Sequence, residues 1–74
     1  MIVIIAGTYD EAQRHAAIRG YDPGRWVMAQ SRKQLRKVAM TAVQLVGSYE
    51  AVAGWRVLFD YASDRIGKPA WDVP

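Results

Sequence analysis

Two stretches of this sequence repeat the same order of chemical groups. Residues 4–10 read Ile-Ile-Ala-Gly-Thr-Tyr-Asp, and residues 44–50 read Gln-Leu-Val-Gly-Ser-Tyr-Glu. In each stretch an apolar run ends at glycine, and a hydroxyl side chain, a tyrosine and a carboxylate follow. Free amides at the start of a helix bind anions, and a tyrosine ring stacks on a base or a sugar. The repeat therefore predicts a candidate nucleotide or phosphate site made of Gly7, Thr8, Tyr9, Asp10, Gly47, Ser48, Tyr49 and Glu50.

The same repeat has a second interpretation that involves no ligand. A turn from a strand into a helix needs a glycine, a capping residue and an acid in the first turn, so two such turns resemble each other without a shared function. Asp10 and Glu50 would repel an anion, and the sequence contains neither G-x-G-x-x-G nor Gly-Lys-Ser/Thr. Capping does not account for Tyr9 and Tyr49, however. Both interpretations stay open at the level of the sequence.

The densest charge cluster consists of Arg32, Lys33, Arg36 and Lys37. On a helix, residues 32 and 36 align, as do residues 33 and 37, so the cluster would form one basic face able to contact the phosphates of nucleic acid. It lacks interleaved aromatic residues and a recognition motif. A solvated surface face is the alternative, and nucleic-acid binding is the weakest of the functional hypotheses.

No complete set of catalytic residues or metal ligands can be assembled from this sequence. It has no cysteine and a single histidine, His15, without a recognisable nucleophile motif beside it. Asp60 and Asp64 are one helical turn apart, but two carboxylates alone do not make a metal site. We therefore expect no catalytic residues, no metal and no cofactor, with His15 at the surface or packed against a sheet.

Apolar runs and capping signals predict strands that alternate with helices. Strands are expected at residues 2–6, 25–30 and 41–46, and helices at about 9–19 and 31–38. Capping boxes at Thr8–Glu11 and Ser31–Gln34 would begin these helices, and Gly20 would end the first. A last helix carries an amphipathic stripe and begins either at Ser48 or after Gly54. The stripe consists of Trp55, Leu58, Phe59, Ala62 and Ile66.

This order predicts a small α/β domain with a three-stranded parallel sheet. The most apolar strand, residues 2–6, belongs in the centre, which gives strand order 2-1-3 and places the two glycine loops beside the switch point. The order 3-2-1 would separate those loops. Residues 1–67 are expected to form one domain, and residues 68–74 a tail in which Trp71 docks on the body or on a partner.

The composition narrows the class of protein further. The formal net charge is +3, from ten Lys and Arg against seven Asp and Glu, which is a weak indication of an anionic partner. The longest apolar run, residues 1–6, is far shorter than a membrane span and lacks the features of a signal peptide. We expect no membrane association and a cytoplasmic location.

Three segments of the sequence, "MIVIIAGTYDEAQRHA", "GRWVMAQSRKQLR" and "VQLVGSYE", together resemble small uncharacterised proteins of actinobacteriophages. The resemblance covers about residues 1–50. It implies a truncated Rossmann-like or P-loop-like fold, expression in the host cytoplasm and a host-directed accessory role, and it supplies no catalytic residues.

The leading functional hypothesis is a non-enzymatic protein that acts through protein–protein interaction. A three-stranded sheet has two exposed edges, which suit a host protein or a second copy of the chain. Homo-oligomerisation would also add core that a chain of 74 residues lacks. The alternatives are a nucleotide-binding or phosphate-binding module built on the paired loops, and a weak nucleic-acid binder.

Overall fold

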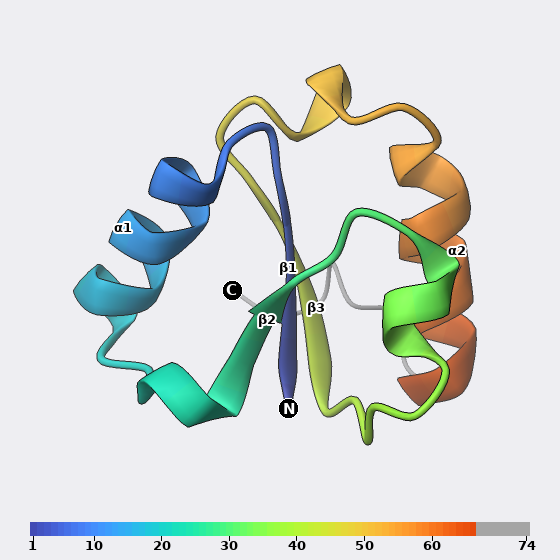
Figure 1. The fold of residues 1–74 in the computed structure, drawn as a ribbon, viewed down its shortest axis with the longest axis horizontal. Helices are drawn as coiled ribbons and strands as arrows, with labels where there is room; N and C mark the ends of the chain where they lie inside the picture. The colour runs from blue at the N-terminus through green and yellow to red at the C-terminus, as the bar shows by residue number, and fades with distance from the viewer. Residues whose placement is uncertain (67–74) are drawn as a thin grey trace.

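The computed structural model describes residues 1–66, whose strands form one parallel sheet (Figure 1). Its strands are β1 (Ile2–Ala6), β2 (Trp26–Met28) and β3 (Ala42–Val46). The strand order within these residues is β2-β1-β3, with parallel pairing on both sides of β1. The predicted α/β class and the 2-1-3 order are therefore confirmed.

The central strand β1 is buried on both faces, as its unbroken apolar sequence predicts. Val3 and Ile5 face one half of the core, and Ile4 and Ala6 face the other, and all four are fully buried. This alternation follows from the two-residue period of a strand. Helical segments on each side of the sheet cover the half of the core that lies on that side.

Helix α1 (Tyr9–Arg19) covers one face of the sheet. Its buried residues, Ala12 and Ala16, are small, which lets the helix approach the strands closely. The hydroxyl of Thr8 accepts a hydrogen bond from the amide of Glu11 at 3.2 Å, and Gly20 ends the helix in the left-handed conformation. The predicted bounds of this helix are confirmed.

Helix α2 (Trp55–Ile66) lies over the opposite face together with a short helical turn, η2 (Arg32–Leu35) (Figure 1). The predicted stripe faces the sheet. Leu58 and Ala62 are buried, and the three other members of the stripe pack around them. Because Leu35 is fully buried in the same cluster, η2 and α2 complete one half of the core together.

The last helix begins after Gly54, and the alternative start at Ser48 is wrong. A separate 3-10 turn, η3 (Tyr49–Ala51), follows β3, and Gly54 has a φ of +72° immediately before α2. A left-handed residue ends helical hydrogen bonding, so the two segments cannot be continuous.

The α-helix predicted over residues 31–38 is also wrong. The chain forms a single 3-10 turn, η2, with Leu35 as its one buried residue. One apolar anchor covers too little of the core to hold two turns of α-helix, and 3-10 turns are short. The side chain of Gln34 turns back to accept hydrogen bonds from the amides of Gln30 (2.6 Å) and Ser31 (3.2 Å), and the bond from Ser31 is the one that the predicted capping box requires.

Strand β2 is shorter than the predicted residues 25–30. A 3-10 turn, η1 (Pro23–Arg25), occupies the chain just before it. The predicted tail, residues 68–74 with Trp71, lies outside the described residues. In the described part of the chain, no helix has the length and apolar character needed to cross a membrane.

Candidate binding sites

The two glycine loops of the repeat lie next to each other at the same end of the sheet. They follow β1 and β3, which are paired along their whole length. A Cβ atom added at Gly7 would overlap the side chain and the carbonyl oxygen of Ser48, and one added at Gly47 would overlap the carboxylate of Glu11. The loops are therefore in direct contact, and glycine is what permits this approach.

One carboxylate, that of Glu11, joins the two loops. Its oxygens accept hydrogen bonds from the amide of Ser48 at 2.8 Å and from the hydroxyl of Ser48 at 2.6 Å. The hydroxyl of Thr8 donates to the same carboxylate at 3.2 Å. Donors that the sequence assigned to a phosphate ligand are thus bound to a side chain of the protein itself.

These hydrogen bonds shift the ionisation of Glu11. The hydroxyl and then the amide of Ser48 lower the pKa of this carboxyl below its ordinary value of 4.5, with smaller contributions from Thr8 and a partial opposition from desolvation. Hydrogen bonds to a carboxylate favour its charged form. The contact between the loops is therefore strongest when Glu11 is ionised.

The two tyrosines of the repeat diverge instead of facing one crevice. Tyr9 lies against Trp26, with ring centroids 5.9 Å apart, whereas Tyr49 meets Trp55 edge-on at 4.9 Å. Trp26 belongs to the α1 half of the core and Trp55 to the α2 half. Asp10 and Glu50, the other members of the predicted set, are exposed. A phosphate at the loops would have to displace Glu11 and would find no aromatic pair around it.

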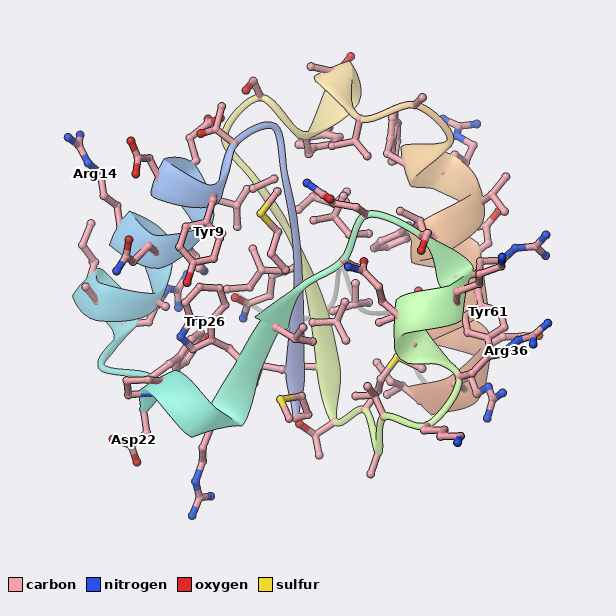
Figure 2. The ribbon with its side chains drawn as sticks, in the orientation of Figure 1. Tyr9, Arg14, Asp22, Trp26, Arg36 and Tyr61 are labelled. Atoms are coloured by element: carbon pink, nitrogen blue, oxygen red, sulfur yellow. The ribbon has the colours of Figure 1, made fainter. Side chains whose placement is uncertain are left out.

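A groove that the sequence did not indicate runs along the outer edge of β2. Its volume is about 350 Å³, and its lining comes from both faces of the strand: Tyr9, Pro23, Trp26, Val27, Met28, Gln30 and Gln34. Tyr9 is 59% exposed although it is a large aromatic residue. Figure 2 shows the rings of Tyr9 and Trp26 side by side between α1 and β2. The sequence does show the two aromatic residues, Tyr9 and Trp26. They indicate a groove only once β2 is known to be an edge strand.

A second groove, of about 290 Å³, lies between β3 and α2. It is lined by Leu45, Trp55, Arg56, Phe59 and Asp60. Its floor is apolar, whereas Arg56 and Asp60 are exposed at successive turns of α2. Arg56 also stacks over the ring of Trp55 at 5.4 Å.

The predicted basic cluster is exposed, but it does not lie on one continuous helix. Arg32 and Lys33 belong to η2, whereas Arg36 and Lys37 follow its end. The predicted alignment of residue 32 with 36, and of residue 33 with 37, required a longer helix than η2.

Of the remaining polar candidates, His15 has a structural partner. His15 Nε2 lies 2.7 Å from Gln44 Oε1, and Gln44 Nε2 donates to the hydroxyl of Tyr21 at 2.9 Å. This network connects α1 to β3, so His15 packs against the sheet. Asp60 and Asp64 are exposed, and within residues 1–66 no three His, Asp or Glu side chains gather closely enough to hold a metal ion.

No family model matches the chain, and comparison with curated proteins and with solved structures also finds no match.

Proposed function

We propose that this protein is a non-enzymatic interaction module that holds an extended segment of a partner protein along the free edge of β2. The observation that carries the proposal is the exposed ring of Tyr9, which lies tilted against Trp26 beside a strand that pairs on one side only within residues 1–66. An extended peptide that joins a sheet edge gains affinity from main-chain hydrogen bonds and specificity from side-chain pockets.

The backbone of β2 supports this mode of binding. The amide of Ala29 donates to the carbonyl of Ile4 at 2.9 Å, so Ala29 directs its main-chain groups toward β1. Main-chain groups of successive strand residues point to opposite sides, so those of Met28 and Trp26 point away from β1. They offer donors and acceptors to an incoming strand.

The surroundings of the groove favour one kind of segment. Its lining is mostly apolar and aromatic, which suits apolar side chains at alternate positions. Gln34 lines this groove and belongs to η2, in which Arg32 and Lys33 are exposed. An acidic residue flanking the apolar positions would therefore meet a cation. A host protein is the expected partner, because the sequence resembles small actinobacteriophage proteins.

A displayed library of random nine-residue peptides, selected on the full chain, tests the proposal. We expect enrichment of peptides with apolar residues at alternate positions and an acid at one end. In a ¹⁵N titration with the best peptide, the amide signals of Trp26 and Met28 should shift, while that of Val43 should not. Tyr9→Ala should weaken binding roughly 5–30-fold, the equivalent of one or two kcal/mol.

Ile18→Ala is the matched control, because Ile18 is an apolar residue of the same helix that is 84% exposed and does not line the groove. It should leave the affinity unchanged. Equal affinity of the Tyr9→Ala and wild-type chains would contradict the proposal. Signal shifts confined to Gly47 and Ser48 on addition of a nucleotide would instead favour the nucleotide-binding alternative.

A further inference from the structure

The middle of β3 is buried, although within residues 1–66 this strand pairs only with β1. Its central residue, Val43, is 1% exposed. The side chain of Val43 belongs to the half of the core that α2 and η2 complete, which accounts for its burial. The main-chain groups of the same residue need a different explanation, because the side of β3 away from β1 carries no described strand.

The main-chain groups of Val43 point away from β1. The amide of Ala29 donates to the carbonyl of Ile4 at 2.9 Å, so Ile4 directs its main-chain groups toward β2. By alternation, those of Val3 point toward β3, where a parallel ladder bonds them to the two residues that flank the register partner, Val43. The amide and the carbonyl of Val43 are therefore left for a further strand. A buried main-chain group without a hydrogen-bond partner is rare in folded proteins.

The side of α2 next to β3 carries a buried hydroxyl and an apolar groove. The hydroxyl oxygen of Ser63 is buried and has no hydrogen-bond partner within residues 1–66. Ser63 is one helical turn from Phe59, which lines the groove of about 290 Å³ together with Leu45 and Trp55. These three groove residues are half-buried. A segment beside β3 would therefore cover an apolar floor and come close to the hydroxyl of Ser63.

The path of the chain leads to this side of the sheet. The connection from β2 to β3 passes over β1 through η2, on the face of the sheet that α2 also covers (Figure 1). A crossover of the same hand through α2 continues in the same direction and brings the chain beyond β3. Residues 67–74 follow α2 directly. Connections from a helix to a strand commonly take about two to six residues, so residues 67–69 suffice for the turn.

We propose that residues 70–73 form a fourth strand, parallel to β3, with Trp71 in the groove between β3 and α2. The segment reads Ala-Trp-Asp-Val, so Trp71 and Val73 share one face and Asp72 lies on the other. The apolar face matches the apolar floor of the groove. Pro69 precedes the segment, and proline is tolerated at the start of a strand because it has no amide to donate.

The burial of Val43 and Ser63 favours this occupant over a second copy or a partner protein. Both groups are buried within a single chain, so the cover that they need belongs to the chain itself. A fourth strand beside β3 leaves the edge of β2 as the place where a further strand can join the sheet. The inference is independent of the proposed peptide site, because that site lies at the opposite edge.

Hydrogen exchange and nuclear Overhauser contacts, measured by NMR on the full chain, test the fourth strand. The amide of Val43 should exchange about a hundredfold or more slowly than in an unfolded peptide, and the indole of Trp71 should contact the ring of Phe59. Trp71→Ala should speed exchange at Val43 about tenfold relative to exchange at Val3 in the central strand. Asp72→Ala is the matched control, because Asp72 is the next residue on the opposite face, and it should leave this ratio unchanged.

An unprotected amide at Val43 in the wild-type chain would overturn the proposal, and so would a Trp71 indole without contacts to Phe59. Isotope-filtered spectra of a mixture of labelled and unlabelled chains identify the copy that supplies Trp71. Contacts between different copies would overturn the proposal in favour of an exchanged segment. Circular dichroism shows whether Trp71→Ala stays folded, and the wild-type measurements decide the proposal even if it does not.

Discussion

The carboxylate of Glu11, at the start of α1, accepts two hydrogen bonds from Ser48, which lies 37 residues later after β3. This contact joins the two loops that leave the adjacent strands β1 and β3. It also fills, with a side chain of the protein, the position in which a ligand carboxylate or phosphate would bind. The first two predictions follow from this relationship.

Glu11→Gln should lower the melting temperature by several degrees. A carboxamide offers one acceptor oxygen where the carboxylate offers two, so it cannot accept from the amide and the hydroxyl of Ser48 on separate oxygens. Glu50→Gln is the matched control, because Glu50 is an exposed acid in the short turn that follows the second glycine loop. Thermal unfolding followed by circular dichroism should show a larger decrease for Glu11→Gln, and equal decreases would contradict the assigned role of this carboxylate.

The same contact predicts how the stability depends on pH. Because the folded-state pKa of Glu11 lies below its ordinary value of 4.5, the contribution of this group is complete above pH 4.5. It is lost as the pH falls through the lowered folded-state pKa. Urea unfolding between pH 7 and pH 3 should therefore show a smaller acid dependence in Ser48→Ala than in the wild type. A Ser48→Ala chain with an unchanged slope would show that Glu11 does not titrate through this contact.

Alanine substitutions at three glycines should separate backbone strain from steric overlap. Gly20→Ala should cost about 1–2 kcal/mol, because Gly20 has a φ of +73° but open space around it. Gly47→Ala should cost more, since it has a φ of +56° and its Cβ would also overlap Glu11. Gly24→Ala should be nearly neutral, having neither feature. Chemical denaturation gives the three free energies of unfolding, and a different order would refute this account of the loops.

Removal of one hydroxyl should test the polar network between α1 and β3. Tyr21→Phe leaves the amide of Gln44 without its acceptor in a half-buried position and should lower the free energy of unfolding by about 0.5–1.5 kcal/mol. The control is Tyr61→Phe, which removes an exposed hydroxyl that accepts from Arg65 at 2.7 Å. Its effect should be smaller, and a larger effect at Tyr61 would argue against a stabilising network at His15.

Neighbouring positions on α2 should respond very differently to truncation. Leu58 is 3% exposed in the core, whereas Val57 is 53% exposed. Leu58→Ala should therefore cost about 2–5 kcal/mol, and Val57→Ala about 0.5 kcal/mol or less. Urea titrations of both variants compare these costs directly. Similar values would mean that α2 is rotated about its axis relative to this structure.

The fold class, the strand order and the elements encoded by local sequence could be predicted, whereas side-chain contacts between segments far apart in the chain could not. The bounds of β1 and α1 follow from an unbroken apolar run and from the caps Thr8 and Gly20, all within one segment. The bond between Glu11 and Ser48 was missed because a capping box assigns Glu11 to its own turn. Only the adjacency of β1 and β3 brings Ser48 within reach.

The errors have physical causes of the same kind. The helix expected at residues 31–38 had a capping box but a single buried anchor, Leu35, so tertiary packing supported only one turn. The β2 groove could not be predicted, because the pairing of Tyr9 with Trp26 depends on how α1 crosses the sheet.

The position of β1 in the centre of the sheet has a consequence for synthesis on the ribosome. This strand is made before both of the strands that flank it, and before the helix that covers Val3 and Ile5. At a synthesis rate of about 5–20 residues per second, its apolar side chains stay exposed for on the order of seconds before the covering segments are made. The domain therefore cannot fold stepwise from its N-terminus. During translation, the most apolar segment of the nascent chain is a natural target for a chaperone until β3 and α2 have emerged.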